Sequence, residues 1–114
     1  MIEEIVKNYL LSVLSVPVYI DVPARPPAKY VSLERTGGGE TEHIRSAMVA
    51  IQSYGATRYD AAELHESVMS FMKRLNEQDN VSACDLNAEY DYTDTATKRY
   101  RYQSVFDIIY FEVE

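Results

Sequence analysis

The sequence predicts an α+β fold: an antiparallel sheet built of β-hairpins, packed against two amphipathic helices that lie mainly on one of its faces. Two segments predict helices: apolar residues recur every three or four positions in residues 2–15 and again in residues 60–75. Residues 30–55 and 81–113 predict the sheet, because they form alternating or apolar runs separated by turn-forming residues. With 114 residues, the chain is expected to be a single domain, 1–114.

The first helix is predicted for about residues 2–15. Its acidic residues, Glu3 and Glu4, fall in the first turn, where the helix dipole favours negative charge. Pro17 should end the helix. The apolar stripe consists of Ile2, Ile5, Val6, Tyr9, Leu10, Val13 and Leu14.

A short strand at 18–20 and a connector at 21–28 follow the first helix. The connector holds three of the four prolines of the chain, and proline fixes φ and removes a backbone donor. We expect a rigid, extended connection. A ligand for a proline-recognition domain is the weaker interpretation, because no PxxP register with consistent basic flanks is present.

Residues 30–55 are predicted to form a hairpin with a Gly-rich tip at 36–42. The second strand, 43–54, is apolar on both alternating faces around its middle, as in a central strand covered twice. A phosphate-binding loop is excluded, because no Lys-Ser/Thr follows the glycines and a strand comes next. We expect the tip to be exposed and mobile and to dock on a partner. The candidate partner-binding residues are Gly37, Gly38, Gly39, Glu40 and Glu42.

The second helix is predicted for residues 60–75. Asp60 and Glu63 have the spacing of a capping box, in which each side chain accepts a backbone N–H of the first turn. The apolar stripe that should dock this helix on the sheet consists of Ala61, Leu64, Val68, Met72 and Leu75.

The C-terminal hairpin, 81–113 with a turn at 93–98, gathers tyrosines and arginines, which protein interfaces favour. Ordinary cross-strand aromatic pairing with cation–π contacts is the structural alternative. Asp107 shares a strand face with apolar neighbours, so it should pair with Arg45, Arg99 or Arg101, or lie at an interface or a wet edge. The candidate self-assembly residues are Tyr90, Tyr92, Arg99, Arg101 and Asp107.

Composition narrows the function classes. The formal net charge of −7 argues against a general nucleic-acid binder, which needs a basic face. No long apolar run predicts a membrane span, and the acidic N-terminus does not look like a secretory signal. The single cysteine allows no internal disulfide and fits a reducing compartment.

No motif for catalysis or for metal binding is found in the sequence. His43 and His65 lack the spacing of metal ligands, and each is expected to be solvated or at the edge of an apolar stripe. Cys84 could act as a nucleophile only if folding brought a histidine near. We therefore expect a protein that is not an enzyme and has no metal and no cofactor.

Several segments in one order resemble a known family. They are Val-Pro-Val-Tyr at 16–19, Tyr-Val-Ser-Leu at 30–33 after the proline-rich connector, and Ala-Met-Val-Ala-Ile-Gln-Ser-Tyr-Gly at 47–55. The turn into Asp-Ala-Ala-Glu-Leu at 60–64 completes the set. Together they resemble the tail-terminator, or tail-completion, proteins of long-tailed bacteriophages and prophages, over essentially the whole chain.

This resemblance implies a structural protein of the virion tail, synthesised in the cytoplasm of a bacterial host. Its partners would be copies of itself in a ring, expected to be a hexamer, the tail tube protein, and a head-closure or neck protein. The ring would cap the finished tube and stop its polymerisation. DNA would pass through the centre without specific binding, and no membrane would be involved.

Alternatives stay open at this point. One is a head–tail connector or neck protein, another a small α+β ligand-binding or enzymatic dimer, and a third a bacterial adaptor unrelated to phage. The feature that favours assembly is a sheet with more apolar surface than two helices can cover.

Overall fold

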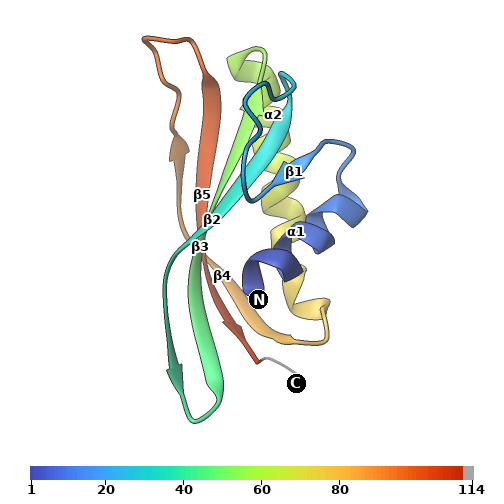
Figure 1. Cartoon of the computed structure of the whole chain (residues 1–114), viewed down its shortest axis with the longest axis vertical. Helices are drawn as coiled ribbons and strands as arrows, with labels where there is room; N and C mark the ends of the chain where they lie inside the picture. Colours follow the sequence, from blue (N-terminus) through green and yellow to red (C-terminus); the bar gives the residue numbers. More distant parts are fainter. Residues whose placement is uncertain (112–114) are drawn as a thin grey trace.

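The computed structural model describes residues 1–111 and confirms an α+β fold (Figure 1). The helices are α1 (Ile2–Val13) and α2 (Arg58–Met72), and α2 is followed by a 3₁₀ turn, η1 (Leu75–Glu77). The strands are β1 (Val18–Tyr19), β2 (Tyr30–Thr41), β3 (Ile44–Gly55), β4 (Val81–Asp91) and β5 (Tyr100–Tyr110). The predicted C-terminal hairpin thus forms, but residues 112–113 of its predicted range lie outside the described part.

The five strands form one sheet in the order β1-β2-β3-β5-β4. Four of them pair antiparallel, as predicted, but β1 pairs parallel with β2 through Val18 opposite Val31, so the sheet is mixed at this edge. The physical reason is the proline-rich connector. It acts as a crossover that returns the chain to the starting end of β1 before β2 begins.

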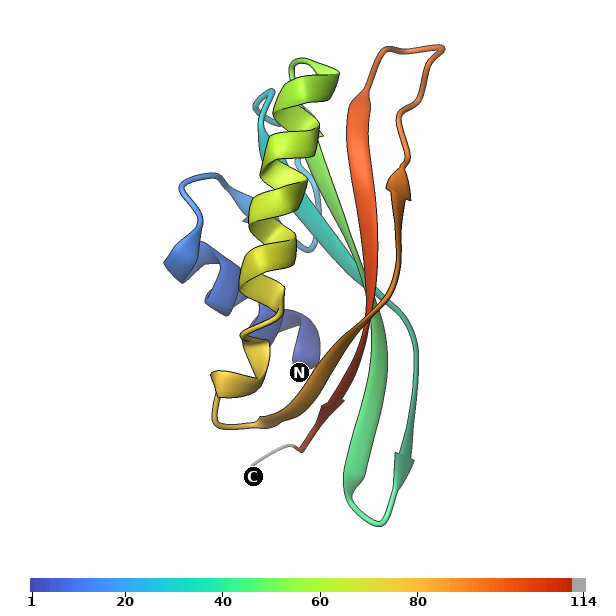
Figure 2. The same cartoon turned by 180° about the vertical axis from the view of Figure 1, so that it is seen from behind.

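The core lies on what we call the inner face of the sheet. Alternation places Leu33 opposite Ile51 and Val49 opposite Phe106 on this face. Side chains of both helices join the same cluster, and Figure 2 shows α2 lying along the sheet. The principal core residues are Ile2, Val6, Leu10, Val31, Leu33, Val49, Ile51, Leu64, Val68, Met72, Leu75, Phe106, Ile108 and Tyr110. The predicted stripe of the second helix is therefore confirmed, although Leu75 lies in η1.

Both helix boundaries differ from the prediction. The first helix ends at Val13 because Leu14 adopts an extended conformation, ahead of the proline. The second begins at Arg58, and its N-cap is Thr57, whose hydroxyl accepts the Asp60 N–H at 3.0 Å. The capping box predicted for Asp60 and Glu63 is therefore wrong. Gly55 allows this tight entry, because a Cβ there would lie 2.4 Å from Ala61 N.

The predicted Gly-rich tip is also wrong, because the two strands continue to Thr41 and Ile44. The turn consists of Glu42 and His43 alone, with φ of 51° and 71°, as a two-residue hairpin loop with left-handed residues requires. The three glycines lie inside β2, opposite residues 46–48 of β3 and just after a bulge. We call residues 36–48 the arm. Figure 1 shows that its turn projects beyond the rest of the chain.

Candidate assembly surface

The candidate site is the outer face of the sheet, formed by the side chains that alternate away from the core. On β3 these are Met48, Ala50, Gln52 and Tyr54, and none of them belongs to the core cluster. The centre of β3 is buried on both faces, as predicted, since Ala50 and Gln52 are buried as well as Val49 and Ile51. Toward the arm, however, the outer face opens to solvent.

In the half of the outer face away from the arm, the buried polar side chains are hydrogen-bonded to one another, while Tyr90 and Tyr92 remain 43% and 45% exposed. A hydrogen-bond chain that we call the ladder crosses four strands, from Ser32 to Gln52 to Gln103 to Tyr90. Ser32 Oγ donates to Gln52 Oε1 at 2.8 Å, Gln52 Nε2 donates to Gln103 Oε1 at 2.5 Å, and Gln103 Nε2 donates to the Tyr90 hydroxyl. Both glutamines are buried. Each side chain of the ladder is hydrogen-bonded to the next, so these buried polar groups need no partner from a helix.

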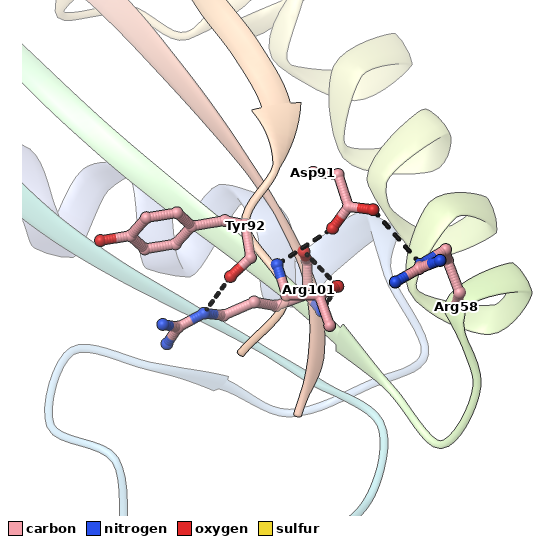
Figure 3. Close-up of polar contacts among 5 residues, drawn as sticks. Arg58, Asp91, Tyr92 and Arg101 are labelled. Atoms are coloured by element: carbon pink, nitrogen blue, oxygen red, sulfur yellow. Dashed lines mark hydrogen bonds and ion pairs between the residues drawn. The ribbon is translucent and has the colours of Figure 1, made fainter. Parts of the chain in front are cut away.

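Tyr92 and Arg101, two of the predicted self-assembly residues, contact each other within one copy. The Arg101 guanidinium lies 4.4 Å from the centre of the Tyr92 ring, and its Nε donates to the Tyr92 carbonyl at 2.8 Å (Figure 3). Arg101 Nη1 also donates to the Tyr54 hydroxyl at 3.1 Å. Tyr90 meets Tyr92 edge to face at 5.8 Å, and Arg99 lies 5.9 Å from the Tyr54 ring. The cation–π alternative therefore accounts for much of this cluster.

Asp91 anchors the start of the β4–β5 turn to α2. Its carboxylate accepts the Thr93 N–H at 3.0 Å and lies 3.3 Å from Arg58 Nε (Figure 3). Hydrogen bonds from Thr93, with a smaller contribution from the Arg58 charge, hold the pKa of Asp91 below its usual value. This end of the hairpin is thus fixed by internal contacts.

The half of the outer face along the arm has the opposite character. Ile44, Met48 and Ile109, which we call the apolar patch, are 58%, 37% and 41% exposed. They surround Ser46, which pairs with Ile109. A groove of about 420 Å³ runs here, and the three glycines of β2 form one of its walls.

The glycines explain why this surface is flat. A Cβ on Gly37 would come no closer than 4.0 Å to Met48, and one on Gly39 would lie 3.6 Å from Ser46 Oγ. Neither position therefore needs glycine for internal packing. Only Gly38 does, because its Cβ would lie 2.7 Å from the Ser46 carbonyl oxygen. Side chains are missing where the chain itself has room for them, which leaves backbone accessible to another molecule.

Asp107 lies at the edge of the apolar patch and is exposed. It accepts a hydrogen bond from Asn87 Nδ2 at 2.9 Å and sits opposite Asp85. The predicted pairing with an arginine is wrong. Arg99 and Arg101 lie at the other end of the hairpin, and Arg45 alternates to the inner face over the Tyr110 ring. The wet-edge alternative is the one that the structure supports.

Of the two places predicted for His65, the structure supports the one beside the apolar stripe of α2, and the side chain is buried and not solvated. It is 2% exposed, stacks on Tyr102 at 5.2 Å, and its Nε2 lies 2.9 Å from Glu89 Oε1. The signal was present in the sequence, because position 65 falls four residues after Ala61 and three before Val68. His43, by contrast, is exposed in the arm turn.

His65, Glu66 and Glu89 could offer three metal ligands, since one ligand atom of each lies within 4.8 Å of the others. A metal-bound histidine normally donates its second ring N–H to a partner. His65 Nδ1 is buried and has no hydrogen-bond partner within residues 1–111. The geometry is therefore that of a hydrogen bond holding β4 against α2, with Nε2 as the donor.

Cys84 faces the core side of β4 and is partly buried. Burial, reinforced by the charges of Asp85 and Asp107, raises the pKa of its thiol to about 12. The thiolate needed for nucleophilic attack is therefore scarce at neutral pH.

The sequence matches no protein-family model and no curated protein. In the part of the chain that the structure describes, neither helix has the length and apolar character to cross a bilayer.

Proposed function

We propose that this protein is a structural component of a phage or prophage tail: a tail terminator that assembles into a ring, caps the tail tube and presents a surface for head joining. The observation that carries the proposal is the apolar patch beside the glycines of β2. One isolated copy leaves this surface uncovered, and the arm extends it beyond the body of the domain.

Two properties of the surface favour a protein partner over a small molecule. The exposed apolar side chains lie on a sheet face, which suits a second extended surface. The groove along the opposite side of the arm, of about 500 Å³, is lined by Arg35, Thr36, the three glycines, Glu40 and Arg45, and so lacks the mainly apolar lining of typical ligand pockets.

The net charge suits a ring around DNA, because an acidic channel would not retain the duplex. A head–tail connector would use the same features. A tail terminator stops the growth of the tail tube, whereas a head–tail connector does not, so the length of the tubes distinguishes the two functions. Only a terminator should shorten tubes when it is added to a polymerising tail tube protein.

The test combines native mass measurement with negative-stain electron microscopy of the purified chain, alone and with the tail tube protein. We expect rings with a central opening near the width of a DNA duplex. The double variant M48D/I109D should abolish them, because two carboxylates would then lie in the buried contact. Leu11→Asp is the control for a carboxylate placed on another exposed apolar position, since Leu11 is 44% exposed on α1, away from the patch. A monomer under all conditions, or unchanged rings in M48D/I109D, would contradict the proposal.

A further inference from the structure

The two hairpin turns of the protein share an unusual backbone feature. Glu42, His43 and Lys98 are the only non-glycine residues with positive φ within residues 1–111. Positive φ favours Gly, Asn, Asp and His, so Glu42 and Lys98 adopt it at a cost in stability. Glu42 and His43 form the arm turn, and Lys98 lies in the β4–β5 turn. Figure 1 places these turns at opposite ends of the long axis, which measures 45 Å.

The β4–β5 turn forms one wall of a small basic pocket. The pocket holds about 250 Å³, and Pro26, Pro27, Tyr30, Tyr54, Lys98 and Arg99 line much of it. Lys98 and Arg99 are exposed, and neither makes an ion pair in the described chain. The acid of the same turn is already engaged, because Asp94 Oδ1 accepts the N–H groups of Ala96 and Thr97 at 3.1 and 3.4 Å.

The arm end carries the opposite charge. Glu40 and Glu42 are exposed and, over residues 1–111, form no ion pair. Glu42 is one of the two turn residues and Glu40 lies two positions before it, so both acids lie at a narrow tip. Arg45, the one arginine of the arm, lies opposite Glu40 in the β2–β3 register and over the Tyr110 ring, whereas Glu42 lies in the turn itself.

We propose that Glu40 and Glu42 of one copy dock in the pocket of a second copy, against Lys98 and Arg99. This rests on the proposed self-assembly and specifies its contact. The two charged ends lie too far apart to meet within one copy, so the contact is head to tail. A head-to-tail contact is heterologous and generates a ring when the rotation closes. Because each copy carries a net charge of −7, a local pairing of opposite charges would also set the register of association.

The experiment is a charge swap. E40K/E42K and K98E/R99E should each weaken self-association by about 100-fold or more, because like charges would then face each other. An equimolar mixture of the two variants should restore assembly, since each reversed end now finds its complement. Sedimentation velocity over a concentration series, without and with the tail tube protein, gives the readout. Circular dichroism should show both variants folded, because the substituted residues are exposed.

Control variants carry the same charge changes elsewhere. E4K/D79K adds four positive charges and K7E/K73E adds four negative charges, away from both turns; both should assemble like the wild type. Variants E40K/E42K and K98E/R99E that assemble normally would overturn the inference, as would a mixture that stays monomeric. If those variants still form rings that cap tubes, the proposed function stands and only the contact is wrong. If the wild type forms no ring under any condition, both are wrong.

Discussion

Neither α1 nor α2 covers the outer face of the sheet, and its two halves differ in how their side chains are accommodated there. Away from the arm, polar groups that no helix covers are hydrogen-bonded to one another along the ladder, and tyrosine and arginine side chains pack beside them. Along the arm, apolar side chains and glycine backbone remain exposed. A self-satisfied surface gains little from a partner, whereas an exposed apolar one gains free energy when it is covered. This difference supports the proposal that the first half stabilises the domain and that the second half is where another protein binds.

Breaking the ladder should have a large effect on stability. Gln103→Leu removes the acceptor of Gln52 Nε2 and leaves that buried donor unpaired. We expect the free energy of unfolding to fall by about 1–3 kcal/mol, measured by urea denaturation. Tyr90→Phe removes only the terminal hydroxyl and should cost less, about 1 kcal/mol.

The matched substitution on the other half is Ile109→Ser. Because Ile109 is 41% exposed on the apolar patch, we expect the free energy of unfolding to change by less than about 0.5 kcal/mol. Self-association should nevertheless weaken. If Ile109→Ser destabilises the monomer as much as Gln103→Leu does, the division between a structural half and an assembly half is wrong.

A second prediction separates the glycines within the arm. Gly38→Ala should lower the free energy of unfolding by about 1–3 kcal/mol, since its Cβ would lie 2.7 Å from a backbone carbonyl oxygen that must move. Gly37→Ala should be neutral or stabilise slightly, by up to about 0.5 kcal/mol, because space is open and alanine loses less entropy on folding.

The assembly measurement should give a different order for the same two glycine variants. Gly37→Ala adds a methyl group to the flat surface and should weaken ring formation although the protomer is intact. Unchanged rings in Gly37→Ala would mean that no partner backbone approaches this position closely.

Periodicity was sufficient to predict the helices, the core face and the central strand, because each element repeats one pattern over many residues. It failed at the turns. Glycines normally mark the position of a tight turn, and three of them stood five residues or fewer before the real one, whose Glu-His sequence carries no turn signal. The Asp60 cap was wrong for a similar reason, since Thr57 three residues earlier is also a favoured N-cap residue.

The candidate surface could be predicted only in part. Its glycines and the aromatic hairpin were identified from composition, but the ladder joins residues as many as 51 positions apart, and no local pattern shows such a contact. Asp107 can meet an arginine only if the two side chains lie at the same end of the sheet and on the same face. Strand order and register fix that, and the sequence of one chain does not reveal them.

A small pH dependence of stability is expected in the structural half. The pKa of Asp91 is lowered in the folded state, so its carboxylate contributes stability above the pKa of the unfolded chain. That contribution is lost as the pH falls through the lowered folded pKa. Asp91→Asn should therefore lower the free energy of unfolding at pH 7 by about 0.5 kcal/mol, since the group is well solvated, and the difference from wild type should vanish in acid.

Arg58→Ala provides the control for the Asp91 effect, since Arg58 is the ionic partner. Urea denaturation at pH 7 and at pH 2–3 of the two single variants and the double variant gives a thermodynamic cycle. At pH 7 the double variant should lose less free energy of unfolding than the two single variants lose together, because both single variants remove the same ion pair. Strict additivity would assign the lowered pKa to Thr93 alone, and the β4–β5 turn would then be held by its own hydrogen bonds and not by its tie to α2.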